Sequence, residues 1–490
     1  MQLYGVGLQL SYFGTIGIIF FYNTMKEILS NLKIMKNIRN IHLQKVTNSI
    51  IKMISVTLSA QIMILPITLY YFNIIGIYFL LNNILVSLII GPIMFIAILF
   101  LIFTFINNPH LVKFISTILI IGIKILIFIS NISEFPLAKI YVKTPSKISI
   151  LGYYISIIII KKLYEIYSKK EINNTEKRVK NLISLGKYRF NEYKRKNRKK
   201  VKKIAKVAVI ISIIAITINK INSNLKVYFV DVGQGDCSFI VTPQNKTILI
   251  DGGGSLSKKF DIGKNTLLPY ILDRGFTKID YMIISHFDQD HCGGLIYILN
   301  EIKVKNIIIG KQYENYPNYE NFIKCATRQK IKVHIVEAGM KIKIENKVYI
   351  DVLWPDSKNM ILENSINNNS LVCKLKHKEF SILFTGDIEK PAEEAILKKY
   401  KNFELESTVL KIAHHGSKTS SSIEFLDKVN PKYALIGVGK NNNFNHPSSQ
   451  TITKLREKNI RIYRTDLNGE TSIKTSGERN KIKLSIKINK

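Results

Sequence analysis

Apolar residues crowd the first 160 positions of this 490-residue chain, and this uneven distribution constrains the fold more than any other feature. The run at 3–22 carries no charge and is long enough to cross a bilayer. Because a chain in hydrocarbon must pair its backbone polar groups internally, such runs predict transmembrane helices. One or two helices would suffice as an anchor, so a larger number favours transport. The further apolar runs cover 53–72, 74–106, 111–130, 148–160 and about 204–219.

The run at 74–106 is too long for one simple span and is interrupted by Asn82-Asn83 and Gly91-Pro92. We expect a re-entrant or interfacial piece there, because two cytoplasmic basic segments require an even number of crossings between them. The span at 204–219 would then carry the rest of the chain to the outer face. This scheme leaves Met1 outside with no preceding anchor, which suggests a missing upstream part.

Composition divides the chain into four predicted parts. They are a polytopic transmembrane domain over 1–160, a basic cytoplasmic linker over 161–203, a transmembrane helix over 204–222 and a soluble domain over 223–490. The formal net charge of +36 would suit a polyanionic partner. Lysine is abundant throughout, however, so charge alone does not identify one. The four cysteines form no C-x-x-C pair, which argues against a cysteine-based zinc site.

The densest chemical cluster is Ser-His-Phe-Asp-Gln-Asp-His-Cys-Gly-Gly at 285–294. It lies between a strand-like run at 281–284 and a helical pattern at 295–299. A lone H-x-D would usually be a solvated loop. Four ligand-type side chains at i, i+2, i+4 and i+5, by contrast, would repel one another or stay unpaired unless a cation joined them. The cluster therefore predicts a metal site on a strand-to-helix turn.

Other polar clusters also follow strand-like runs in the second half of the chain. Singly, each would be taken as a cap or a solvated loop, but together they indicate one site in a layered α/β domain. These clusters are Asp-Val-Gly-Gln-Gly-Asp at 231–236, Asp251-Gly252-Gly253, Thr385-Gly386-Asp387, His414-His415-Gly416-Ser417 and Asn445-His446-Pro447.

In this order and spacing the motifs resemble the metallo-β-lactamase superfamily and, more closely, the C-terminal domain of ComEC-type DNA-uptake (competence) proteins. The resemblance covers almost all of 225–475, and Gly-Leu-Gln-Leu-Ser-Tyr at 7–12 resembles a motif of that family's membrane domain. It implies an α-helical polytopic membrane domain followed by an αββα metallo-β-lactamase-like domain. The family's N-terminal extracytoplasmic β-domain and first transmembrane helices have no counterpart, so the chain resembles a truncated or fragmentary member.

The resemblance also implies two divalent ions, Zn²⁺ or Mn²⁺, that share a hydroxide. Asp387 would bridge the two ions, and the choice between His414 and His415 as the ligand stays open. The expected metal ligands are His286, Asp288, Asp290, His291, Asp387, His414 and His415.

The expected catalytic residues are Asp290, His446 and His414. Asp290 would take the proton of the attacking water or act as a ligand, and His446 would be a general acid or a phosphate contact. The residues expected to support the site or to be structural are Asp231, Asp236, Asp251, Asn368 and Ser370. The last two stand where the superfamily's usual third-motif histidine is missing. An oxygen-richer ligand set admits Mn²⁺ as well as Zn²⁺.

We therefore expect a multi-pass cell-membrane protein for DNA uptake. Its extracytoplasmic, metal-dependent nuclease domain would degrade or process DNA during import of a single strand. Two alternatives stay open, a membrane-anchored phosphoesterase acting on cell-envelope phosphodiesters and a transport component with a non-catalytic hydrolase-like domain. The sequence has no G-x-x-x-x-G-K phosphate loop, so transport would depend on ATP-driven translocation proteins and a DNA receptor of the uptake machinery. An oligomer also stays open.

Overall fold

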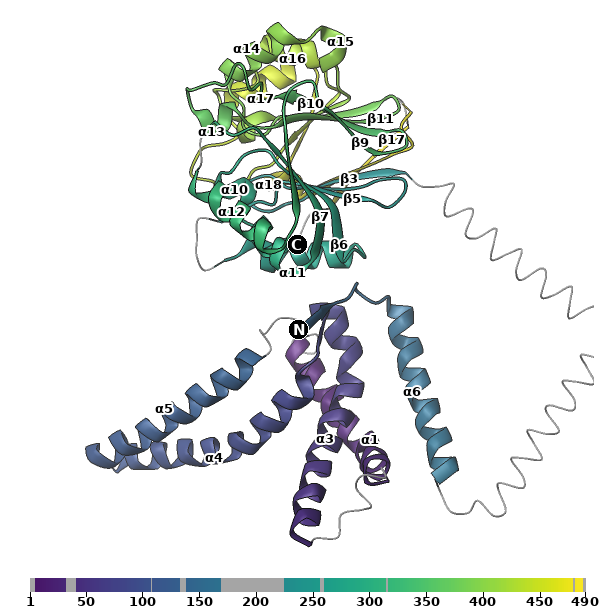
Figure 1. The fold of residues 1–490 in the computed structure, drawn as a ribbon, viewed down its shortest axis with the longest axis vertical. Coiled ribbons are helices and arrows are strands. Elements are labelled where there is room, and N and C mark those ends of the chain that lie inside the picture. The colour runs from purple at the N-terminus through teal and green to yellow at the C-terminus, as the bar shows by residue number, and fades with distance from the viewer. Residues whose placement is uncertain are drawn as a thin grey trace, which may run out of the picture. The chain divides into compact units, whose positions relative to one another are not determined.

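The computed structural model describes residues 5–31, 41–106, 108–132, 138–168, 224–255, 260–313, 316–478 and 481–487. The chain divides into two compact units. One is helical and comprises 1–201 with the short segment Leu272–Gly275, and the other comprises the rest and holds two large sheets (Figure 1). The predicted helix at 204–222, and the predicted linker beyond residue 168, lie outside the described residues.

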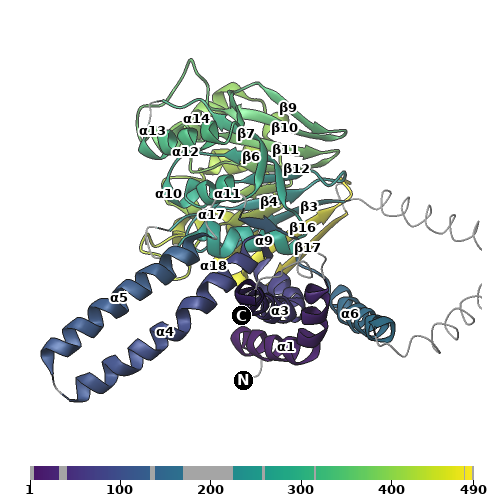
Figure 2. The ribbon, with the colours of Figure 1, turned by 60° about the horizontal axis from the view of Figure 1, so that its bottom comes forward.

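Five long helices and one small antiparallel ribbon form the described part of the helical unit. Figure 2 shows α1 beside α3 and α4 beside α5. Gly17 allows the first pair to approach closely, because a side chain there would meet the Ser59 carbonyl oxygen at 2.3 Å. The elements are α1 Val6–Ser30, α3 Ile41–Phe72, β1 Ile74–Gly76, α4 Phe79–Phe105, α5 Pro109–Asn131, β2 Lys139–Tyr141 and α6 Lys147–Ser168.

Three of these helices, α3, α4 and α5, are long and apolar enough to cross a membrane. Large apolar side chains cover their surfaces, and Phe128 on α5, for example, is 70% exposed. A helix that is apolar all round fits a lipid environment. The spans predicted at 3–22 and 148–160 fall on α1 and α6, which are not among the three, and their crossing stays a prediction.

The interruptions expected at Asn82-Asn83 and Gly91-Pro92 are wrong, whereas a re-entrant or interfacial placement of this run stays a prediction. Helix α4 continues from Phe79 to Phe105 through both Asn82-Asn83 and Gly91-Pro92. A proline inside a helix removes one backbone donor, and this local loss is tolerated in long apolar helices. Only the start of the run departs from helix, where Ile74–Gly76 pairs with Lys139–Tyr141.

The second unit contains two mixed sheets. In spatial order the first sheet comprises β17 Ile482–Lys487, β16 Glu470–Thr475, β3 Leu225–Phe229, β4 Ser238–Val241, β5 Thr247–Ile250, β6 Lys278–Ile284, β7 Lys303–Gly310 and β8 Lys332–Val336. The second comprises β15 Arg461–Arg464, β14 Tyr433–Ile436, β13 Val409–Lys411, β12 Phe380–Phe384, β11 Val372–His377, β10 Val348–Trp354 and β9 Lys341–Glu345. Strands β5 to β8 and β12 to β15 run parallel.

The two sheets lie face to face, with helices on both outer surfaces (Figure 1). Apolar side chains from both sheets, among them Val227 and Ile382, fill the space between them. A second apolar cluster joins the second sheet to its outer helices. This arrangement confirms the predicted αββα sandwich. The remaining helical elements are η3 Gly263–Leu267, α9 Leu268–Asp273, α10 Gln289–Cys292, α11 Leu295–Glu301, α12 Pro317–Arg328, α13 Ser365–Asn368, α14 Lys390–Lys399, α15 Asn402–Leu405, η4 Ala413–Gly416, α16 Ile423–Val429, α17 Ser449–Glu457 and α18 Thr465–Asn468.

Candidate metal centre

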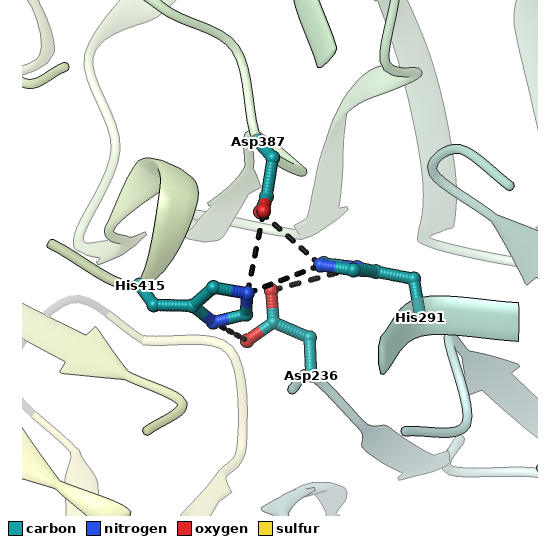
Figure 3. A group of neighbouring side chains, drawn as sticks. All are labelled: Asp236, His291, Asp387 and His415. Carbon is teal, nitrogen blue, oxygen red and sulfur yellow. Dashed lines mark hydrogen bonds and ion pairs between the residues drawn. The ribbon is translucent and has the colours of Figure 1, made fainter. Parts of the chain in front are cut away.

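Polar side chains from both sheets meet at one edge of the sandwich (Figure 3). Asp236, His291, Asp387 and His415 are all buried, and each offers one potential ligand atom within 4.8 Å of the others. Two of them follow strands of the first sheet, and the other two follow the neighbouring parallel strands β12 and β13 of the second. Parallel strands bring their carboxyl ends to the same edge, which explains why distant motifs converge here.

Three side chains have the spacing expected of ligands to one ion. The Nε2 atoms of His291 and His415 lie 3.3 Å apart. Asp387 places Oδ1 at 3.3 Å from His291 Nε2 and Oδ2 at 3.3 Å from His415 Nε2. Ligands held at about 2.0–2.1 Å around a tetrahedral ion would lie about 3.3–3.4 Å apart. The geometry therefore fits a divalent transition-metal ion.

Asp290 supplies a fourth candidate ligand on the solvent side. Its Oδ2 lies 3.2 Å from His415 Nε2, and its side chain is 31% exposed. Asp288 and Asp290 also line a cavity of about 670 Å³. Asp290 therefore belongs both to the wall of this cavity and to the cluster of candidate ligands.

Hydrogen bonds on the other side of each ring orient the two histidines. His291 Nδ1 lies 3.0 Å from Asp251 Oδ2, and His415 Nδ1 donates to the Gly437 carbonyl oxygen at 2.7 Å. Asp251 is itself fixed by the backbone N–H and the hydroxyl of Ser285, both at 2.8 Å. With Nδ1 bonded in this way, Nε2 is the nitrogen left to coordinate a metal.

Asp236 faces the Nδ1 side of the same rings, and its main partner is a lysine. Its oxygens lie 3.7 Å from His415 Nδ1 and 3.8 Å from His291 Nδ1. They form an ion pair with Lys411, which also lies 3.6 Å from Asp387 Oδ1. Sequence reasoning missed Lys411. The signal was available, because a lysine between Leu410 and Ile412 interrupts a run that is otherwise of buried type.

The carboxylates of this cluster favour protonated imidazoles beside them. Burial opposes a charge on His415, but Asp387 and Asp236 outweigh it and raise the pKa of His415 to about 10. Burial is likewise outweighed at His291, where Asp387 raises the pKa well above its usual value. The same contacts overcome burial at Asp387 and keep its pKa well below the usual range. Carboxylates that hold protonated imidazoles in this way would also hold a metal cation.

His286 and Asp288 lie beside this set. His286 Nε2 is buried without a hydrogen-bond partner among the described residues, and Asp288 Oδ2 lies 3.7 Å away. Burial, with a contribution from His291, lowers the pKa of His286 to about 3. A neutral imidazole with a free buried nitrogen next to a carboxylate has the chemistry of a second metal site with fewer ligands.

His414 has other partners than its neighbour in the chain. Its Nδ1 lies 3.3 Å from Glu389 Oε1, and its ring lies 5.6 Å from that of His446. Both His414 and His415 adopt positive φ angles, 48° and 52°, in the turn η4. This turn sends the two rings to different partners, and the structure brings only His415 into contact with His291 and Asp387.

The remaining predicted residues hold the loops around the cluster. Ser370 Oγ accepts a hydrogen bond from the Asp387 backbone N–H at 3.3 Å, and Asn368 Oδ1 accepts one from Glu389 at 3.0 Å. Asp231 Oδ1 accepts one from the Gly233 N–H at 3.2 Å. These are the contacts of supporting residues, and the role of each residue in binding or catalysis stays a prediction.

Known proteins resemble both parts of this chain. Residues 1–165 match the Competence protein family, and residues 230–339 match the Metallo-beta-lactamase superfamily. ComE operon protein 3 of Bacillus subtilis is 34% identical over 260 residues, which is 51% of this chain and 33% of the relative. Competence protein ComA of Neisseria gonorrhoeae is 30% identical over 239 residues, 49% of this chain and 30% of the relative.

Among solved structures, CmlA, a diiron beta-hydroxylase from Streptomyces venezuelae, is similar at 14% identity with a TM-score of 0.35. The match covers 52% of this chain and 54% of CmlA. The fold assignment rests instead on the strand order and the family match. The matched stretch spans about a third of the length of the two curated relatives. The predicted resemblance is confirmed: the chain joins a Competence protein domain to a metallo-beta-lactamase superfamily domain.

Proposed function

We propose that this chain takes part in DNA uptake at the cell membrane and that its second unit is a metal-dependent nuclease. One observation carries the proposal. His291, His415, Asp387 and Asp290 are spaced for one ion beside an open cavity, in a chain that also has a competence domain. Phosphodiester cleavage is a reaction that such an ion assists.

These four residues would hold the principal ion, which when bound supplies a Lewis acid and an acidic water. The protein's contribution is to fix the ligands before the ion arrives. Asp251 and Gly437 set which ring nitrogen of each histidine is available. His286 and Asp288 would hold a second ion with fewer ligands, and both Zn²⁺ and Mn²⁺ suit this mixed set.

His414 and His446 would handle protons and phosphate at the rim. Glu389 Oε1 lies 3.3 Å from His414 Nδ1, where a carboxylate could orient a general base or acid once that nitrogen carries a proton. Burial, together with His414, lowers the pKa of His446. We therefore assign His446 to phosphate contact through its N–H, and His414 to the proton on the attacking water or the leaving group.

The nuclease unit would lie on the extracytoplasmic side of a multi-pass membrane domain. The three long apolar helices support membrane residence, and the basic segments support the orientation. DNA entry would draw its energy from ATP-driven partners and its substrate from a DNA receptor. A topology reporter inserted at residue 180 should report the cytoplasmic side, and a signal from the outer face would contradict this scheme.

The test incubates the purified full chain in detergent with Mn²⁺ or Zn²⁺ and linear single- or double-stranded DNA. Bis(p-nitrophenyl) phosphate is run in parallel, and Asp290→Ala is the inactive control. We expect DNA cleavage that is lost in the control. Cleavage of the small diester without DNA cleavage would point to an envelope phosphodiesterase. Metal binding without any hydrolysis would favour the third interpretation, a transport component with a non-catalytic hydrolase-like domain.

A further inference from the structure

Lys411 places a charged ammonium in the space between the two sheets. It ends strand β13, where side chains alternate between the inter-sheet core, with Val409, and the outer helices, with Leu410. Lys411 shares the inward face with Val409 and is only 4% exposed. A buried charge is costly unless it is well paired, so its partners define its role.

Three oxygen-bearing groups surround the ammonium. Asp236 forms an ion pair with it, Asp387 Oδ1 lies 3.6 Å away, and the Gly386 carbonyl oxygen accepts a hydrogen bond at 3.2 Å. Asp236 follows a strand of the first sheet, while Gly386 and Asp387 follow a strand of the second. The ammonium therefore links the two halves of the sandwich, next to the carboxylates of Asp236 and Asp387.

Asp387 is shared between this ammonium and the candidate ion position. Its Oδ1 faces both Lys411 and His291, whereas its Oδ2 faces His415. Asp236 likewise lies between the ammonium and the Nδ1 atoms of the two histidines. The lysine and a divalent ion would thus draw on the same negative charge at short range, where electrostatic effects are strong.

We propose that Lys411 is a tethered second cation of the metal centre. Its ammonium neutralises Asp236 and Asp387 when no metal is bound, which keeps the ligands in place, and its charge lowers the affinity of the neighbouring site for a divalent ion. The inference rests on the metal-binding part of the proposed function and is independent of the substrate. It makes Lys411 a positioning residue and not a ligand.

The test measures Mn²⁺ affinity in the full chain in detergent, from the electron paramagnetic resonance signal of free Mn²⁺. Lys411→Met removes the charge at nearly constant length, and we expect Mn²⁺ to bind about tenfold more tightly or better. Asp236→Asn leaves the ammonium with Asp387 as its only carboxylate ion-pair partner among the described residues, so we expect weaker binding by about tenfold. The double variant should return close to the affinity of the unaltered chain.

The opposite signs separate this role from a purely structural one. A lysine that only supports the fold would make both variants bind Mn²⁺ more weakly or leave both unchanged, and either result would overturn the proposal. Asp236→Asn conserves shape, and unchanged or tighter Mn²⁺ binding in this variant would overturn the proposal even if Lys411→Met does not fold.

Lys374→Met is the matched control. Lys374 is also a buried strand lysine, but its ammonium donates to the backbone carbonyls of Glu404 and Glu406. The Lys374→Met variant should bind Mn²⁺ with the affinity of the unaltered chain. A change in affinity as large as that in Lys411→Met would overturn the proposal. Absence of Mn²⁺ binding in the unaltered chain would refute the metal centre itself. Mn²⁺ binding without DNA cleavage would refute only the nuclease.

Discussion

His291 Nε2 and His415 Nε2 lie 3.3 Å apart although 124 residues separate them in the chain. One histidine belongs to α10, after a strand of the first sheet, and the other to η4, after a strand of the second. Two bare nitrogen lone pairs would repel at this distance, so a proton or a cation must lie between these rings and the surrounding carboxylates. Metal binding therefore competes directly with protons.

This competition predicts a strong pH dependence of metal affinity. Asp387 and Asp236 raise the pKa of His415 to about 10 against the effect of burial, and Asp387 likewise raises the pKa of His291. In the absence of metal we therefore expect both imidazoles to be protonated near neutral pH. A metal must displace these protons, so Mn²⁺ affinity should rise with pH up to about 10. Calorimetry in buffers of different ionisation enthalpy should show more than one proton released per ion at pH 7.5. Proton uptake on binding, or no proton release at all, would contradict the assignment.

The paired histidines should separate cleanly by mutation. We expect His415→Ala to lower Mn²⁺ affinity by about 100-fold or more, because it removes a buried ligand nitrogen. His414→Ala should keep the affinity within about threefold, since His414 Nδ1 lies beside Glu389, but should slow DNA cleavage by about 100-fold. Metal titration and turnover on the same preparations measure both effects. Loss of metal in His414→Ala with retention in His415→Ala would reverse the assignment.

The sequence predicted the sandwich and the motif residues that gather at its edge, because strand-like runs and polar strand ends are local patterns. It could not tell which of His414 and His415 contacts His291 and Asp387, since the positions of the two rings depend on a turn with two positive φ angles. Nor did it indicate the pairing of Lys411 with Asp236. This ion pair joins residues that follow strands of different sheets, and no local sequence pattern marks such a long-range contact. Helix α4 also continues through Pro92, although Gly91-Pro92 is locally a helix-breaking pair. The long apolar helix around it tolerates the loss of one backbone hydrogen bond, and a local pattern does not show this.

Asp251 should matter to metal binding although it lies behind a ligand. Its carboxylate accepts from Ser285 and meets His291 Nδ1 at 3.0 Å, which fixes the ring and its tautomer. Asp251→Asn replaces one acceptor oxygen by a donor and should weaken Mn²⁺ binding by about 10- to 100-fold. Asp231→Asn is a matched control, because among the described residues the side chain of Asp231 accepts its hydrogen bond from a turn N–H, that of Gly233. Equal losses in both variants would argue for a general effect on folding.

Gly386 is the residue at which the backbone itself positions a ligand. It has a φ of 54°, and a side chain there would lie 2.7 Å from Ser370 Cβ and 2.9 Å from Ser285 Cβ. Gly386→Ala should therefore cost both backbone strain and overpacking, about 2–4 kcal/mol of unfolding free energy, and should displace Asp387. Gly339→Ala supplies the control, because Gly339 also has a positive φ, 94°, but nothing lies within 4 Å of an added side chain. It should cost about 1–2 kcal/mol and leave Mn²⁺ affinity unchanged. Denaturant unfolding and Mn²⁺ titration measure the two effects, and unaltered affinity in Gly386→Ala would show that Asp387 does not depend on this turn.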